Sequence, residues 1–167
     1  MNRFILIILL LIPSISFASD SFTDAVKNRF QKKTAVDLTD WYAKGNTWIA
    51  EFKGETYLLD LDLKAAVRKN EINIKMRHLK GTEKPDVNFF VKMTSGLCAQ
   101  IFEPFIFPEQ ASKGPRTWDD ESPRPLEFLY LDSLTQAQDD PIDKTVNGWN
   151  IKAERSVLLT SCSAIKQ

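Results

Sequence analysis

Hydrophobic residues near the start of the chain recur with the spacing of a helix. Apolar side chains stand at every fourth position from Phe22 to Phe30, and Ser21 with Asp24 matches the serine-x-x-acid capping pattern. This pattern predicts an amphipathic helix over residues 21–34, and we expect its apolar stripe to pack on a sheet.

From Trp48 onward, apolar and polar residues alternate, as in strands that bury one side and expose the other. Lys53 and Gly54 are predicted to form the turn of a β-hairpin. Pro104 cannot donate to a β-ladder, so its segment is expected at a sheet edge or as two short strands. The segments with strand character are residues 48–52, 57–64, 72–77, 87–93, 99–108, 126–132 and 148–162.

The predicted strands follow one another without helical segments long enough for parallel crossovers, which favours antiparallel pairing. We therefore expect an α+β fold that is mainly β, with one N-terminal helix packed on a curved antiparallel sheet or small barrel of six to eight strands. Residues 108–125 and 133–147 interrupt the strand pattern. Irregular stretches of this length are uncommon unless they are functional or disordered.

The first residues have the layout of a secretory signal peptide. Arg3 gives a positive start, residues 4–12 are all apolar, and Ala18 supplies a small residue for cleavage. A membrane-spanning helix needs about 20 apolar residues, which is more than this run provides. We expect residues 1–18 to be a signal peptide and residues 19–167 to form a single globular domain, periplasmic or secreted, with no membrane span after cleavage.

The two cysteines, Cys98 and Cys162, both belong to the expected mature chain. An even count in an oxidising compartment favours pairing, so we predict a disulfide bond between them. The same argument disfavours Cys98 as a catalytic thiol with His78 as its base.

Basic and acidic side chains are equal in number, 22 of each, and they are mixed along the chain. Nucleic-acid binding draws on clustered Lys and Arg, so we expect no nucleic-acid partner. His78 is the single histidine, and alternation places it on the apolar face of its strand. It is predicted to be a hydrogen-bonded or rim histidine rather than a general base, because no spacing brings a nucleophile or carboxylate beside it. The sequence lacks a zinc ligand set, and we expect no metal and no cofactor.

Carboxylates offer another route to catalysis, because glycoside hydrolysis needs only two of them. Asp60 and Asp62 are predicted to project from one strand face, with Glu51 on the neighbouring strand. The same three residues also fit an ordinary solvated face of a sheet. Asp119, Asp120 and Glu121 have the oxygen ligands that calcium takes, but no EF-hand pattern surrounds them.

The segment "ASKGPRTWDDESPRP" lies within the 108–125 loop and is the main binding candidate. Its three prolines reduce the entropy lost when a loop is held in a bound shape. Arg116, Trp118, Asp119 and Arg124 are the predicted binding residues, since Trp and Arg dominate interface hot spots. The alternative is that Trp118 folds back as a lid over one end of the sheet.

Three hypotheses for function follow from these patterns. The favoured one is a small, exported, non-enzymatic binding protein that engages another protein or an envelope component. An inhibitor or immunity-type protein acting through the 108–125 loop is one version of it. The alternatives are a small carboxylate-dependent hydrolase of envelope polymers and an accessory subunit of an envelope assembly. The chain has no glycine-x-serine-x-glycine motif and a single histidine, which argues against a serine hydrolase.

Overall fold

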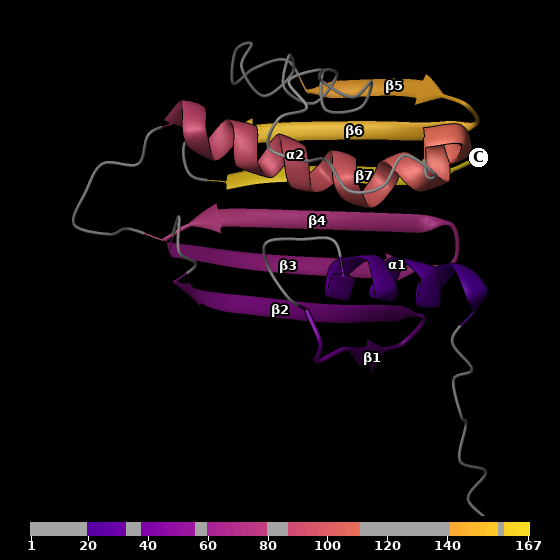
Figure 1. Cartoon of the computed structure of the whole chain (residues 1–167), viewed down its shortest axis with the longest axis horizontal. Helices are drawn as coiled ribbons and strands as arrows, with labels where there is room; N and C mark the ends of the chain where they lie inside the picture. The colour runs from indigo at the N-terminus through magenta and orange to yellow at the C-terminus, as the bar shows by residue number, and fades with distance from the viewer. Residues whose placement is uncertain (1–19, 33–37, 56–59, 80–86, 111–140, 157–158) are drawn as a thin grey trace, which may run out of the picture.

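A computed structural model describes residues 20–32, 38–55, 60–79, 87–110, 141–156 and 159–167. In this part of the chain two α-helices and a short 3-10 helix accompany a seven-stranded antiparallel sheet (Figure 1). The elements in chain order are α1 (Ser21–Lys32), β1 (Tyr42–Lys44), β2 (Thr47–Glu55), β3 (Asp60–Arg68), β4 (Glu71–His78), α2 (Val87–Ile106), η1 (Pro108–Gln110), β5 (Ile142–Val146), β6 (Trp149–Ser156) and β7 (Leu159–Lys166).

The sheet consists of two meanders that meet at its centre. Its strand order is β1-β2-β3-β4-β7-β6-β5, and every neighbouring pair is antiparallel. The predicted mainly β, antiparallel fold is confirmed in these terms. The sheet is open, with β1 and β5 at its two edges, so the small barrel that we also considered is not formed.

Tight turns with positive φ angles connect several of the hairpins. Asn147 and Gly148 join β5 to β6 with φ angles of 48° and 75°, and Asn70 adopts 65° between β3 and β4. Asn-Gly is favoured in such turns because both central residues of a type I′ turn need positive φ. The prediction of a turn at Lys53-Gly54 is wrong, because β2 continues through Gly54, which pairs with Leu61.

The largest difference from the sequence-based expectation is the second helix, α2. Residues 87–93 and 99–108 were predicted as strands, and the structure forms one helix from Val87 to Ile106. Its buried residues include Phe90, Thr94, Leu97 and Ile101, which are spaced by three or four positions. A short apolar run satisfies both the helical and the strand period, so alternation alone misassigned it.

Another difference from the prediction is β5, which lies inside the stretch 133–147 that was expected to be irregular. The strand predicted at 126–132 lies outside the described residues.

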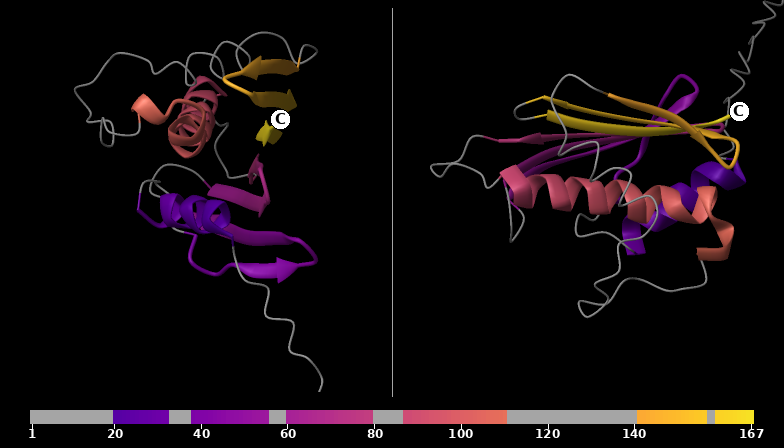
Figure 2. Two further views of the ribbon diagram at one scale, coloured as in Figure 1. Left: turned by 90° about the vertical axis from the view of Figure 1, so that its right-hand side faces the viewer. Right: turned by 90° about the horizontal axis from the view of Figure 1, so that it is seen from above.

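Both helices pack against the same side of the sheet, as the two views in Figure 2 show. On this helix side the alternating residues of β3 and β4 are fully buried, which confirms the predicted alternation from Leu61 and from Ile72. The Cys98–Cys162 disulfide, predicted from the sequence, joins α2 to β7. The largest fully buried side chains are Phe30, Phe102, Leu38, Leu61, Leu63, Ile72, Ile74, Met76, Ile101 and Ile106.

The N-cap of helix α1 lies one residue earlier than the cap predicted from the sequence. The N–H of Thr23 donates to Oδ1 of Asp20 at 2.7 Å, and the N–H of Asp24 donates to the carbonyl of Asp20 at 3.1 Å. Asp20 is therefore the N-cap in place of Ser21, although the predicted helix itself is present. The backbone hydrogen bond from Thr23 is the main cause that lowers the pKa of Asp20 below its ordinary value.

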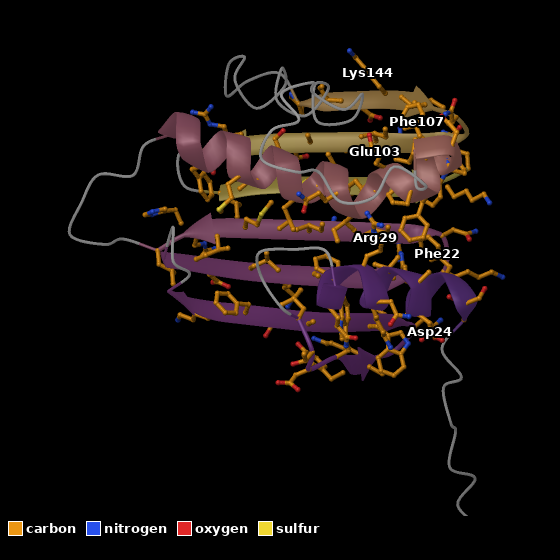
Figure 3. All side chains as sticks on the ribbon, viewed as in Figure 1. Phe22, Asp24, Arg29, Glu103, Phe107 and Lys144 are labelled. Atoms are coloured by element: carbon orange, nitrogen blue, oxygen red, sulfur yellow. A yellow bond between two sulfur atoms is a disulfide. The ribbon has the colours of Figure 1, made fainter. Side chains whose placement is uncertain are left out.

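Helix α2 contains a proline close to its end, and α1 compensates for it. Pro104 has no N–H, so the carbonyl of Gln100, four residues earlier, lacks its normal helical donor. Nη2 of Arg29 donates to this carbonyl at 2.6 Å. Figure 3 shows Arg29 in the space between α1 and α2. A side chain from one helix thus satisfies the backbone that proline leaves open in the other.

Candidate ligand-binding groove

The binding residues predicted from the sequence cannot be placed in this structure. Arg116, Trp118, Asp119 and Arg124 all lie outside the described residues, as do the other acidic residues considered for calcium. Of the 108–125 loop, only Pro108–Gln110 is described, as η1. Both roles considered for Trp118, as a lid and as part of a recognition surface, therefore remain predictions.

The face of the sheet opposite the helices is polar, and we call it the open face. The strand register lines up its side chains in rows that cross the sheet. The row through the middle, the central row, is Tyr42, Ile49, Ala66, Asn73, Ser163, Lys152 and Asp143. The adjacent row, the charged row, is Glu51, Lys64, Lys75, Ser161 and Glu154.

A shallow groove of about 320 Å³ lies on the open face over β2, β3 and β4. The side chains that form its floor are short, because Ala66 and Asn73 lie opposite each other on β3 and β4. Cationic side chains stand around this floor. The groove is lined by Thr47, Lys64, Ala66, Arg68, Glu71, Asn73 and Lys75.

Two of the three cations in the groove are paired with carboxylates. Nζ of Lys64 donates to Oε1 of Glu51 at 2.5 Å, and Arg68 forms an ion pair with Glu71 across the β3–β4 turn. The hydrogen bond with Lys64 lowers the pKa of Glu51, and the same bond raises the pKa of Lys64. Both groups are solvent-exposed, so this pair stabilises the fold only weakly.

Lys75, the third cation, differs from the other two. Within the part of the chain that the structure describes, it forms no ion pair or hydrogen bond through its side chain. Lys64 lies directly opposite it on β3, and Ser161 lies directly opposite it on β7. The groove therefore places an unneutralised ammonium group between another lysine and a small hydroxyl residue.

The carboxylates considered for hydrolysis lie at one side of this groove. Glu51 is on the open face of β2, and Asp62 is half-buried on the same face of β3. A general acid needs a pKa raised toward the working pH, whereas the Lys64 ammonium group holds the pKa of Glu51 below its usual range. Of Asp60, the structure describes only the backbone position, opposite Glu55.

His78 lies at the end of β4 on the helix side, away from the groove, with 7% of its surface exposed. Its ring meets the ring of Phe90 edge-on at 5.8 Å. Nδ1 of His78 and Oγ1 of Thr160 have no hydrogen-bond partner among the described residues. The ring is thus buried rather than at the rim, and its Nδ1 is not hydrogen-bonded within the described residues, which differs from the hydrogen-bonded or rim histidine that the sequence predicted. In the same portion of the chain, no three His, Cys, Asp or Glu side chains are grouped so as to hold a metal ion.

Sequence reasoning missed the groove because its most informative residues are small. Ala66 and Asn73 occupy outward-facing positions on central strands, where Asp, Lys and Arg stand at most other positions. Short side chains at such positions are the signal that could have located the depression. They become informative only when the register places them opposite one another.

Among the described segments, no helix has the length and apolar character needed to cross a membrane. Comparison with known proteins finds no protein family, curated protein or solved structure that matches this chain.

Proposed function

We propose that the protein is an exported, non-enzymatic binding protein whose ligand occupies the groove on the open face of the sheet. The observation that carries this proposal is the groove itself, a depression over the short side chains of Ala66 and Asn73 that is bordered by Lys64, Arg68 and Lys75. Its volume is at the lower end of the range for small-molecule sites, about 300 to 1,000 Å³. A small ligand, or one unit of a larger envelope component, is the expected occupant.

Binding is favoured over hydrolysis by the state of the nearby carboxylates. Glu51 is an ion-pair partner of Lys64, and its lowered pKa keeps it ionised at neutral pH. Inverting and retaining glycosidases both need one carboxyl group that holds a proton for the leaving group. A carboxylate that is hydrogen-bonded to an ammonium group is poorly suited to that role.

Cross-linking from defined positions tests where the ligand binds. A photoreactive amino acid is placed at Thr47, which lines the groove without forming its floor, and in a matched variant at Gln31, which is exposed on α1 on the other side of the sheet. Both mature proteins are irradiated with envelope material, and the adducts are analysed by mass spectrometry. We expect a discrete adduct from position 47 that is lost when Lys75→Gln is added. Equal labelling from both positions, or none from position 47, would contradict the proposal.

The contribution of the 108–125 loop is tested in the same assay. Trp118→Ala removes the side chain that the sequence singles out. If the loop forms part of the binding surface, the adduct at position 47 should weaken while the thermal unfolding temperature stays constant. If Trp118 is a lid residue, the unfolding temperature should fall, because loss of a buried tryptophan costs about 3 to 5 kcal/mol.

A further inference from the structure

We propose that the groove recognises a phosphate group and that Lys75 is the residue that binds it directly. This inference rests on the proposed function, because it assigns ligand chemistry to the same groove. Three features support it: the position of Lys75, the ion pairs that its cationic neighbours already form, and the hydrogen-bond donors around it.

The opposition of Lys64 and Lys75 is the first step. Directly opposite residues in an antiparallel pair have Cβ atoms about 4.5 to 5.5 Å apart, and like charges in this position destabilise the sheet. Glu51 neutralises Lys64 from the other side. The charged row thus contains two cations and a single carboxylate on strands β2, β3 and β4. An anion placed beside Lys75 would remove the remaining repulsion.

The neighbouring groups supply hydrogen-bond donors without blocking access. Asn73 lies two residues before Lys75 on the same face of β4 and lines the groove. The half-buried Ser161 lies opposite Lys75 on β7, beside the groove, whereas Ser163, opposite Asn73, is buried. Amide and hydroxyl groups donate to phosphate oxygens, and their short side chains leave room for a tetrahedral group. Ala66 adds a further small side chain at the other side of Asn73.

The number of donors, rather than the type of cation, favours phosphate over carboxylate. Arginine binds both groups through its planar fork, and Glu71 already occupies the guanidinium group of Arg68, the arginine in the groove. Lys75 offers a point charge with three donors, and Asn73 and Ser161 lie beside it. A phosphate group has more acceptor oxygens than a carboxylate and can accept from several of these donors together. The acidic side chain nearest to Lys75 by register is Asp62, which lies diagonally from it on β3 and opposite Arg77.

Titration followed by two-dimensional NMR of the mature protein tests this inference. Inorganic phosphate and glycerol phosphate are added separately, and vesicles of phosphatidylglycerol are tested in parallel by sedimentation. We expect phosphate to shift the amide signals of Asn73, Lys75 and Ser161. Lys75→Gln should weaken binding at least about tenfold, because it removes the charged hydrogen-bond donor that contacts the phosphate. Lys75→Arg should retain most of the binding.

Lys53→Gln is the matched control, since Lys53 is exposed on the same face but does not line the groove. Its phosphate affinity should equal that of the unchanged protein. Binding of the soluble phosphates identifies a small phosphorylated ligand, whereas Lys75-dependent binding to vesicles alone places the phosphate on a lipid headgroup. Loss of affinity that is equal in the Lys53 and Lys75 variants, or no binding in any arm, overturns the inference. A groove adduct in the cross-linking assay together with failure of all phosphate arms would leave the proposed function standing and reject only phosphate.

Discussion

The contact between Arg29 and helix α2 gives the sharpest test of how the two helices are held together. Arg29 donates to the Gln100 carbonyl at 2.6 Å, and this carbonyl lacks a helical donor because residue 104 is proline. Arg29→Ala should therefore destabilise the fold more than a typical surface substitution. Asn28→Ala, at an exposed neighbouring position on α1, is the control and should change the free energy of unfolding by no more than about 0.5 kcal/mol.

The expected magnitude follows from the chemistry of the lost bond. A hydrogen bond from a charged group is worth about 1.5 to 3 kcal/mol, and removing the donor leaves a part-buried carbonyl unsatisfied. The aliphatic stem of Arg29 adds some packing against the helices. We expect Arg29→Ala to lower the free energy of unfolding by about 2 to 3 kcal/mol.

Pro104→Ala separates the hydrogen bond from the packing. Alanine at position 104 restores an N–H that can donate to Gln100, so the carbonyl no longer depends on Arg29. In this background Arg29→Ala should cost about 1 to 2 kcal/mol less than in the unchanged protein. Urea unfolding, followed by far-UV circular dichroism with the disulfide intact, measures all four corners of the cycle. Equal costs in the two backgrounds would refute the compensation.

Three further predictions concern other interactions that cap the helices or attach them to the sheet. Asp20→Asn keeps a good N-cap but removes the charge. Because the pKa of Asp20 is lowered in the folded protein, the stability that its carboxylate adds should be present above the ordinary pKa of 3.8 and be lost as the pH falls through the folded value. Acid-induced unfolding curves of the two proteins should therefore differ at neutral pH and converge at low pH. Replacing Cys98 and Cys162 together by alanine should cost about 2 to 5 kcal/mol in thermal or urea unfolding, since their bond closes a sequence separation of 64 residues; an unchanged midpoint would show that α2 is held by packing alone. Asn147→Gly tolerates the positive φ but loses the 2.9 Å hydrogen bond to the Ile106 carbonyl, and it should cost about 0.5 to 1.5 kcal/mol by the same measurement, unless water replaces the amide without loss.

The parts of the fold that followed from the sequence are those with a single consistent period. In β4, each apolar residue from Ile72 onward is buried and each polar residue between them faces outward, so alternation identified both the strand and its buried side. Helix α1 was identified in the same way from apolar residues four positions apart. The disulfide was predicted from the expected compartment and the even number of cysteines, without any knowledge of the geometry.

The predictions failed where one sequence pattern is compatible with two different structures. In Val87–Ile106, the apolar residues at positions 87, 89, 91 and 93 alternate as in a strand, whereas those at positions 90, 97 and 101 also fit the spacing of a helix. Pro104 favoured the strand edge, because a proline in a helix interior normally leaves a carbonyl unsatisfied. The donor that makes it acceptable, Arg29, is 71 residues away in the sequence. No local pattern could have revealed it.

The candidate groove depends on register to an even greater degree. Lys64 and Lys75 become neighbours only because β3 and β4 pair around a two-residue turn at Lys69 and Asn70. A register shift by one residue would move every one of these side chains to the helix side. The sequence predicted the strands and the polar character of this face, but it did not predict which polar residues meet.

The groove lies on strands whose opposite side is buried under the helices, and this bears on how it would bind a ligand. β3 and β4 carry the groove on one side, and on the other they carry fully buried residues such as Leu63, Ala65 and Ile74. The disulfide fixes α2 to β7, the next strand, from the helix side. Side chains on strands fixed in this way need little reordering on binding, so a small groove can retain more of its interaction energy as affinity. Loosening the platform by replacing both cysteines should therefore weaken binding in the groove even though neither sulfur atom lies on that face.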